Sequence, residues 1–142
     1  MSLKNIGVIG AGTMGNGIAQ TCAIRGYNVI MQDVSEKVTQ KGLDALGSSL
    51  DRLVKKDKIT QEAGTQALAR IQTTTDIEAM ADRDLVVEAA SENMDVKLPI
   101  FSKLHAICQE STILASNTSS LSLTRIAAAS GRAERVIGMH FF

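Results

Sequence analysis

Short apolar runs alternate with longer amphipathic stretches along the whole chain. Two of the runs, LVVEAA and TILAS, are apolar at consecutive positions, which is typical of strands covered on both faces. Strands are predicted at 5–9, 28–32, 71–73, 85–88, 112–115 and 135–140. Helical spacing of apolar residues is found at 14–25, 35–56, 61–69, 96–108 and 122–129. This alternation predicts an α/β fold with a mostly parallel sheet and helices on both faces.

Glycine and proline positions refine these boundaries. Gly26 stands where a helix C-cap is expected, just before the second strand. Gly42 and Gly47 weaken the prediction for the long helix at 35–56, since each costs about 1 kcal/mol in a helix interior. Pro99, the only proline, falls within the helical pattern at 96–108. We expect that helix to start near Leu98, with the proline in its first turn, rather than to be kinked there.

Composition bounds the class of protein. The chain has 142 residues, 44% of them apolar and 21% charged, as in a single globular domain without repeats or linkers. Its formal net charge is zero, which gives no electrostatic footprint for nucleic acid or an anionic membrane. No run is long enough to span a bilayer and no signal sequence opens the chain, so a cytoplasmic location is expected. Cys22 and Cys108 are expected to be buried reduced thiols, and no metal site is expected.

Three glycines follow the first predicted strand in the segment GVIGAGTMGNGIAQ. They form the pattern G-x-G-x-x-G between a strand and a helix, which is the context of a dinucleotide-binding loop. The first glycine permits a tight turn, the second lets backbone N–H groups approach a pyrophosphate, and the third allows close helix–strand packing. The helix N-terminus then presents N–H donors to the phosphates. A Rossmann-type doubly wound fold is predicted, with cofactor contacts at Gly10, Ala11, Gly12, Thr13, Met14 and Gly15.

Asp33 ends the second predicted strand, in VIMQD. A carboxylate there can accept hydrogen bonds from both hydroxyls of the adenosine ribose and would repel a 2′-phosphate. Between Asp33 and Lys37 there is no Arg or Lys that could receive such a phosphate, so NAD is predicted rather than NADP. The loop does not name a reaction, because a methyltransferase or a non-catalytic nucleotide sensor could carry a similar turn.

Three further segments narrow the function: VVEAASENMDVK at 86–97, ASNTSSL at 115–121 and GMHFF at 138–142. Together with GAGTMGNGIAQ, they resemble the NAD-binding domain of the 3-hydroxyacyl-CoA dehydrogenases, and most of all the bacterial 3-hydroxybutyryl-CoA dehydrogenases. The resemblance covers the whole chain, with four motifs in order. It implies hydride transfer between NAD and carbon 3 of an L-3-hydroxyacyl-CoA, in fatty-acid or butanoate metabolism.

The resemblance also implies residue roles. His140 matches the catalytic base that takes the proton of the 3-hydroxyl, a task suited to an imidazole. Ser119 matches the serine that hydrogen-bonds near the substrate oxygen and the cofactor. Glu92 and Lys97 match residues that contact NAD. Ser49 and Lys56 match residues that contact coenzyme A.

Each assignment has a simpler alternative. His140 could be a surface histidine at a strand end, although that end is where ligands bind in open α/β sheets. The serines and threonine of SNTSS could form an ordinary polar turn, and Lys56 could belong to a solvated charge run with its neighbours. Glu88 is predicted to be a strand-end acid with a structural role, and His105 to be exposed.

Family members continue after HFF with Asn-Pro, a glutamate that pairs with the histidine, and a mostly helical second domain. The resemblance implies that this second domain forms a homodimer and much of the acyl-CoA cleft. The 142 residues are therefore expected to bind NAD with little or no turnover, and to expose an apolar patch near Met139, Phe141 and Phe142. Pro99 departs from the family pattern and puts the placement of Lys97 in doubt.

Two other functions remain open. A stand-alone NAD-binding or sensing module would carry the same glycine loop without catalysis. Another β-hydroxyacid or sugar-nucleotide dehydrogenase could share the nucleotide fold, but the pair of motifs SNTSSL and GMHFF argues against it.

Overall fold

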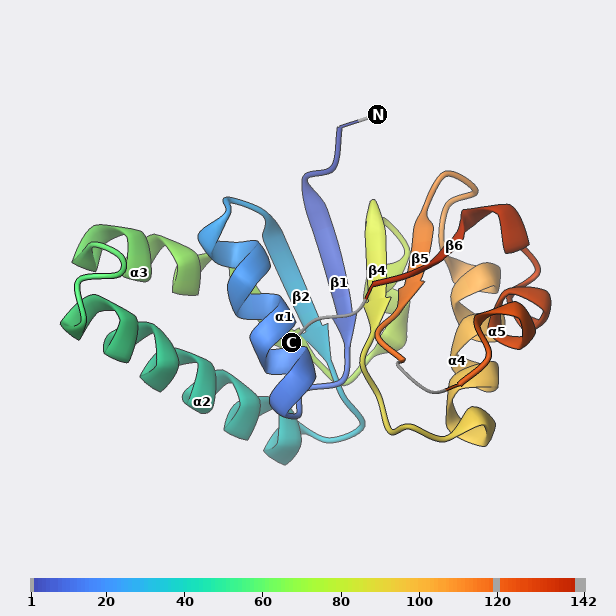
Figure 1. Cartoon of the computed structure of the whole chain (residues 1–142), viewed down its shortest axis with the longest axis horizontal. Helices are drawn as coiled ribbons and strands as arrows, with labels where there is room; N and C mark the ends of the chain where they lie inside the picture. The colour runs from blue at the N-terminus through green and yellow to red at the C-terminus, as the bar shows by residue number, and fades with distance from the viewer. Residues whose placement is uncertain (1, 119–120, 140–142) are drawn as a thin grey trace.

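The computed structural model describes residues 2–118 and 121–139, which form one sheet covered by helices on both faces (Figure 1). The strands are β1 (Asn5–Ile9), β2 (Asn28–Gln32), β3 (Ile71–Thr74), β4 (Leu85–Glu88), β5 (Ile113–Ser116) and β6 (Val136–Gly138). The helices are α1 (Thr13–Ile24), α2 (Glu36–Lys55), α3 (Gln61–Ala69), α4 (Met94–Ile107) and α5 (Leu123–Ser130). Two short 3₁₀ helices, η1 (Ile77–Met80) and η2 (Ala133–Arg135), were not predicted.

Every strand pairing in the described residues is parallel, in the order β3-β2-β1-β4-β5-β6. This is the doubly wound Rossmann order, so the predicted fold class is confirmed. The chain runs outward from β1 to β3 and then returns to place β4 on the other side of β1. In the register of β1 and β4, Ile9 lies opposite Glu88. The loops that follow these two central strands therefore leave the same edge of the sheet side by side.

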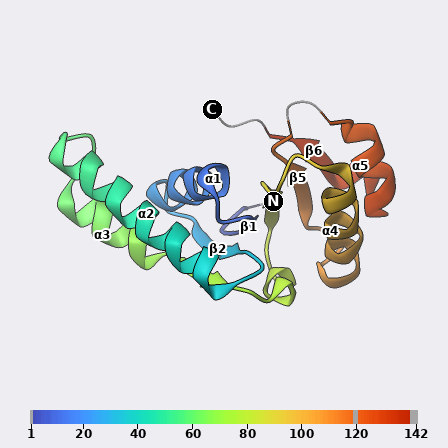
Figure 2. The same ribbon diagram turned by 90° about the horizontal axis from the view of Figure 1, so that it is seen from below.

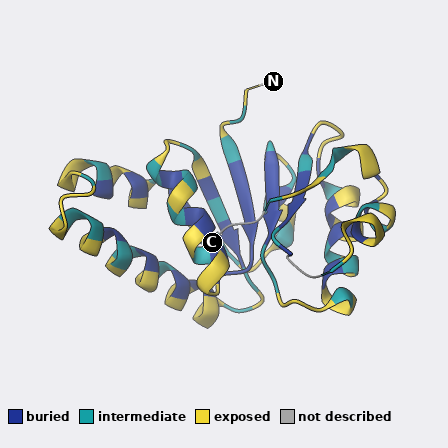
Figure 3. Ribbon diagram, viewed as in Figure 1, coloured by how far each residue is buried: buried dark blue, intermediate teal, exposed yellow. Residues whose placement is uncertain are grey.

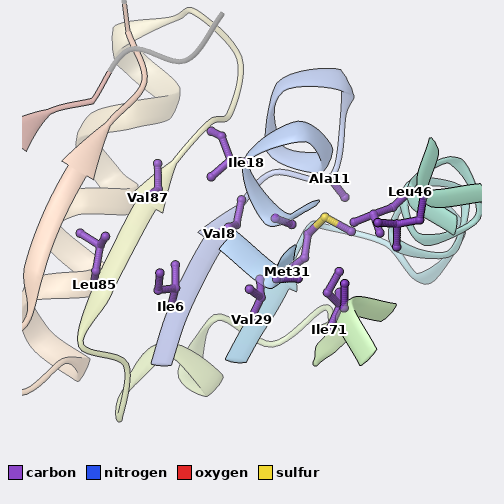
Figure 4. Close-up of a cluster of buried hydrophobic side chains, with 14 of the residues drawn as sticks. Ile6, Val8, Ala11, Ile18, Val29, Met31, Leu46, Ile71, Leu85 and Val87 are labelled. Carbon is purple, nitrogen blue, oxygen red and sulfur yellow. The ribbon is translucent and has the colours of Figure 1, made fainter. Parts of the chain in front are cut away.

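Two apolar layers hold the helices to the sheet. On one face, α1, α2 and α3 pack over residues that include Ile6, Val8, Val29 and Met31 (Figure 4). On the opposite face, α4 and α5 pack over Ile9, Val86 and Leu114 among others, as the view from below also shows (Figure 2). The central strands β1, β4 and β5 are mostly buried, whereas the edge strand β6 is half-buried to exposed and the outer faces of the helices are exposed (Figure 3). The consecutive apolar residues of the strands are explained by this double cover.

Helix boundaries agree with the prediction at most positions. Gly26 follows the C-cap of α1 in a left-handed conformation, with φ +96°. The two glycines of α2 do not interrupt the helix, which continues through both of them. Strand β5 ends one residue later than predicted, at Ser116, and strand β6 ends at Gly138. Each of these differences lies at the end of an element, where pairing with the neighbouring strand decides the boundary.

The predicted late start of α4 is wrong. The helix begins at Met94, and Pro99 lies inside it. The side chain of Asn93 caps the helix by accepting a hydrogen bond from the backbone N–H of Asp95, at 2.9 Å. Proline removes one backbone hydrogen bond from the second turn, but this cap and the buried side chains of Phe101 and Leu104 hold the helix to the sheet.

The two thiols differ in burial. Cys108 is buried as predicted, and its thiol donates to the carbonyl oxygen of Met80 at 3.4 Å. Burial raises the pKa of the Cys108 thiol to about 11. Cys22 is only half-buried, so the prediction for it is partly correct. Burial raises the pKa of its thiol as well.

Of the helices in the described ranges, none has the length and apolar character to cross a membrane.

Candidate functional site

The predicted cofactor loop lies between β1 and α1, where Gly10 makes the turn. Its φ of +109° belongs to the region that favours glycine. Its backbone N–H donates to the carbonyl oxygen of Gln32 at 2.7 Å, which ties the turn to the end of β2. A Cβ at this position would lie 2.7 Å from the carbonyl oxygen of Ala89, in the loop after β4. Gly10 is therefore required both by its backbone conformation and by the neighbouring loop.

Gly12 and Gly15 differ in the space around them. A Cβ on Gly12 would meet no heavy atom within 4 Å, so its backbone faces open space in which a ligand can approach closely. A Cβ on Gly15 would collide with the carbonyl oxygen of Gly10. Gly12 is also the N-cap of α1, and no side chain caps that first turn. The N–H groups of the first turn of α1 therefore have no side-chain cap, and the space beside Gly12 is open, as a helix N-terminus that binds a phosphate requires.

Substitution of Gly15 tests this packing against a matched site on the same helix. Gly15→Ala is expected to lower the free energy of unfolding by about 1–3 kcal/mol, because α1 must move away from the turn. Gly17→Ala is the control, since a Cβ there meets nothing within 4 Å and alanine favours the helix by about 1 kcal/mol. Urea unfolding of the two variants measures the difference. Equal stability of both variants would contradict the close approach of α1 to the loop.

Asp33 stands immediately after β2 and holds the glycine loop in place. Its Oδ2 accepts a hydrogen bond from the backbone N–H of Ala11 at 2.8 Å, and its Oδ1 accepts one from Val34 N–H at 2.7 Å. An ionised carboxylate has about four acceptor positions, so acceptor capacity remains for ribose hydroxyls. The side chain of Val34 beside it is 86% exposed and apolar. This neighbour offers no charge to a 2′-phosphate, which agrees with the predicted preference for NAD.

A cleft of about 500 Å³ opens next to Asp33 at the carboxyl edge of the sheet. It is bounded by the glycine turn, the end of β2 and the loop after β4, and its lining is mostly apolar. The lining residues are Ile9, Gly10, Gly12, Gln32, Asp33, Val34, Ile77, Ala89, Ala90, Ser91, Val96 and Ile100. The position is the one where open α/β sheets bind ligands, at the point where the strand order reverses. The cleft and the glycine loop thus lie next to each other at this edge of the sheet.

The sequence analysis did not predict the close contact between Gly42 and the cofactor loop. A Cβ on Gly42 would lie 2.6 Å from the carbonyl oxygen of Ala11, so α2 packs directly on the cofactor loop. The sequence shows this glycine only as a weak point of a helix. Its distance along the chain from the loop gives no signal of the contact, and only the fold reveals it.

The predicted contacts Glu92 and Lys97 lie on the other side of the cleft, in a polar network. Lys97 is buried, and its Nζ lies 2.5 Å from Glu88 Oε2 and 3.7 Å from Glu92 Oε1. The hydroxyl of Thr118 donates to Glu92 Oε1 at 2.6 Å. The structure therefore brings Glu92 and Lys97 together with the strand-end acid Glu88, which is completely buried. The predicted structural role of Glu88 has a clear basis in these contacts.

Ser49 and Lys56 lie apart from the cleft. Both belong to the distal end of α2, where Ser49 is half-buried and Lys56, the C-cap, is exposed. A rise of 1.5 Å per residue places Lys56 about 30 Å from the start of the helix beside β2 (Figure 1). The assigned contacts to coenzyme A thus lie on a projecting arm formed by α2 and α3 and stay a prediction.

Ser119 and His140 lie outside the described residues, as do Phe141 and Phe142 of the expected apolar patch. The structure does describe the residues on both sides of 119–120 and the segment that precedes His140. Gly138 is the register partner of Ser116, and the backbone N–H of Met139 donates to the carbonyl oxygen of Ser116 at 3.0 Å. The segment that leads to His140 therefore reaches the carboxyl edge of the sheet beside β5. His105 is exposed on α4, as predicted.

Comparison with known proteins agrees with this geometry. The sequence model of the family described as "3-hydroxyacyl-CoA dehydrogenase, NAD binding domain" matches residues 5–142. A 3-hydroxybutyryl-CoA dehydrogenase of Bradyrhizobium diazoefficiens is 47% identical over 139 residues, which are 98% of this chain and 47% of the relative. A 3-hydroxyadipyl-CoA dehydrogenase of Escherichia coli is 42% identical over 142 residues, covering 100% of this chain and 30% of the relative.

Solved structures show the same likeness. The (S)-3-hydroxybutyryl-CoA dehydrogenase PaaH1 of Ralstonia eutropha superimposes with a TM-score of 0.96 and 51% identity, over 99% of this chain and 50% of that chain. FadB2 of Mycobacterium tuberculosis gives a TM-score of 0.97 and 38% identity, over 100% and 50% respectively. The chain thus spans about half or less of the length of these relatives. It belongs to the 3-hydroxyacyl-CoA dehydrogenase family and corresponds to the NAD-binding domain of that family.

Proposed function

We propose that this chain holds NAD for hydride exchange with carbon 3 of a 3-hydroxyacyl-CoA, with 3-hydroxybutyryl-CoA as the preferred substrate. The observation that carries the proposal is the hydrogen bond between Asp33 and Ala11 N–H, which joins the ribose acid to the phosphate loop in one preformed unit. Its relatives named 3-hydroxybutyryl-CoA dehydrogenase support the substrate class. Fatty-acid or butanoate metabolism is the corresponding setting.

Each part of the chain has a distinct task in the proposal. The loop Gly10–Ala11–Gly12 and the first turn of α1, with Thr13, Met14 and Gly15, bind the pyrophosphate through backbone N–H groups. Asp33 binds the adenosine ribose. When bound, NAD supplies the nicotinamide that accepts or returns the hydride.

The remaining residues act on the substrate side or near the nicotinamide half. Glu92 contacts the cofactor. Lys97, which was also predicted to contact NAD, is buried against Glu88 and acts instead by holding the loop after β4. The hydroxyl of Ser119 orients the substrate oxygen and contacts the cofactor. The imidazole of His140 takes the proton from the 3-hydroxyl as general base. Ser49 and Lys56 bind coenzyme A on the arm of α2. Homodimerisation, through a segment that follows this domain in family members, completes the proposal.

A calorimetric titration of the 142-residue chain with NADH and, separately, with NADPH tests cofactor binding. We expect binding of NADH and binding of NADPH that is at least about tenfold weaker, because Asp33 repels a 2′-phosphate and Val34 offers no compensating charge. Equal affinity for the two would contradict the ribose assignment of Asp33. Absence of binding to either nucleotide would contradict the proposed role of this chain as a cofactor-binding unit.

A further inference from the structure

The buried carboxylate of Glu88 joins three separate elements beneath the cofactor cleft. Its Oε2 accepts hydrogen bonds from the backbone N–H of Ala90 at 2.7 Å and from Lys97 Nζ at 2.5 Å. Its Oε1 accepts one from the hydroxyl of Ser116 at 2.6 Å. These donors come from the loop after β4, from α4 and from the end of β5. The side chain of Glu88 has no exposed surface, so none of these bonds competes with water.

Lys97 makes a second side-chain contact with the same loop. Its side chain is 2% exposed, and its Nζ also donates to the carbonyl oxygen of Ala90, at 3.4 Å. The peptide groups on both sides of Ala90 are therefore held by the ion pair, the N–H by Glu88 and the carbonyl by Lys97. Ala90 and its neighbours Ala89 and Ser91 line the cleft. The contacts that fix the backbone of Ala90 therefore also fix this part of the cleft lining.

Ser116 extends the network to the loop after β5. Its hydroxyl oxygen accepts a hydrogen bond from the backbone N–H of Thr118 at 3.3 Å. Thr118 in turn bonds to Glu92 and accepts from the backbone N–H of Leu121 at 3.0 Å. The loops after the neighbouring strands β4 and β5 are thus linked through the carboxylate of Glu88.

We propose that Glu88 and Lys97 are positioning residues for the cofactor: their ion pair holds the backbone of Ala90 in the conformation that accepts NAD, and Ser116 couples that wall to the loop after β5. This inference rests on the proposed NAD binding. A buried ion pair contributes little net stability compared with an apolar pair of the same size, so stability alone does not account for it. We infer that the ion pair serves to fix the positions of the Ala90 N–H and carbonyl groups, to which it is hydrogen-bonded.

The test compares NADH affinity and stability in four variants of the 142-residue chain. Glu88→Met/Lys97→Met removes both charges together and leaves no unpaired ion in the core. We expect it to fold and to bind NADH at least about tenfold more weakly, because Ala90 loses both of its partners. Leu50→Ala is the control for lost stability, because Leu50 is a buried residue of α2 that does not line the cleft. We expect its folded form to bind NADH as the unaltered chain does.

The other two variants keep the ion pair intact and leave Lys97 unchanged. Ser116→Ala removes only the link between the loops, and we expect about threefold weaker NADH binding. Ser116→Thr retains the hydroxyl and is expected to restore the affinity. Unchanged NADH affinity in the folded Met/Met variant, or in Ser116→Ala, would overturn the inference. If the unaltered chain itself fails to bind NADH, the proposed function is contradicted instead, which separates the two results.

Discussion

Asp33→Ala is expected to bind NADH at least about 100-fold more weakly than the unaltered chain. The variant lacks the carboxylate and so loses two charge-assisted hydrogen bonds to the ribose, each worth about 1.5–3 kcal/mol. It also loses the hydrogen bond from Ala11 N–H, which positions the phosphate loop. The effect therefore combines a lost contact with a loosened loop, and calorimetric titration with NADH measures it.

Two further variants make the result specific. Asp44→Ala removes an equal charge from an exposed position on α2 and is expected to leave NADH affinity unchanged. Asp33→Asn retains the size of the side chain and one acceptor oxygen, so an intermediate loss is expected. If Asp33→Ala binds NADH as well as Asp44→Ala does, the ribose assignment is wrong.

His140→Ala is expected to reduce turnover by about 10²–10⁴-fold, the range of a general base, with little change in NADH affinity. The measurement is made in a protein in which this domain is joined to the second domain of its family, with acetoacetyl-CoA and NADH as reactants. The backbone N–H of Met139, the residue before His140, donates to the carbonyl oxygen of Ser116, so Met139 lies at the carboxyl edge of the sheet. An imidazole side chain can take and return a proton near neutral pH.

The control for this experiment is His105→Ala, the other histidine of the chain. His105 is exposed on α4, on the face of the sheet opposite α1, and its Nδ1 accepts a hydrogen bond from Arg132. We expect turnover to persist in that variant. Unchanged turnover in His140→Ala would remove His140 from the mechanism, whereas a parallel loss of NADH affinity would point to a role in cofactor binding.

The cofactor loop shows how far local sequence could predict the site. The roles of Gly10, Gly12 and Gly15 follow from short-range geometry: a strand, a tight turn and a helix within a few residues. Backbone conformation and the absence of a Cβ are properties of each residue alone, so the pattern carries them. Asp33 could be found by the same reasoning, because its place at the end of a strand is also local.

The start of α4 shows where local reasoning failed. The cost of proline in a helix interior is large, so the sequence around Pro99 favours a late start of the helix, whereas in the structure Asn93 caps an earlier start. The side chains of Phe101 and Leu104 hold the helix against β4 and β5, and this packing offsets the missing hydrogen bond. That balance depends on residues distant in sequence, so the pattern around Pro99 could not settle it.

By itself, the sequence determined the class of fold, the cofactor loop and the family, because these depend on period, turn chemistry and short motifs. The tertiary structure alone revealed that Gly42 packs on Ala11, and that Glu88 joins Ala90, Lys97 and Ser116. A hydrogen bond or a close approach between distant segments requires that their separation be set to within a few tenths of an ångström. Such distances are fixed only when the strands have taken their register and the helices have packed on both faces of the sheet.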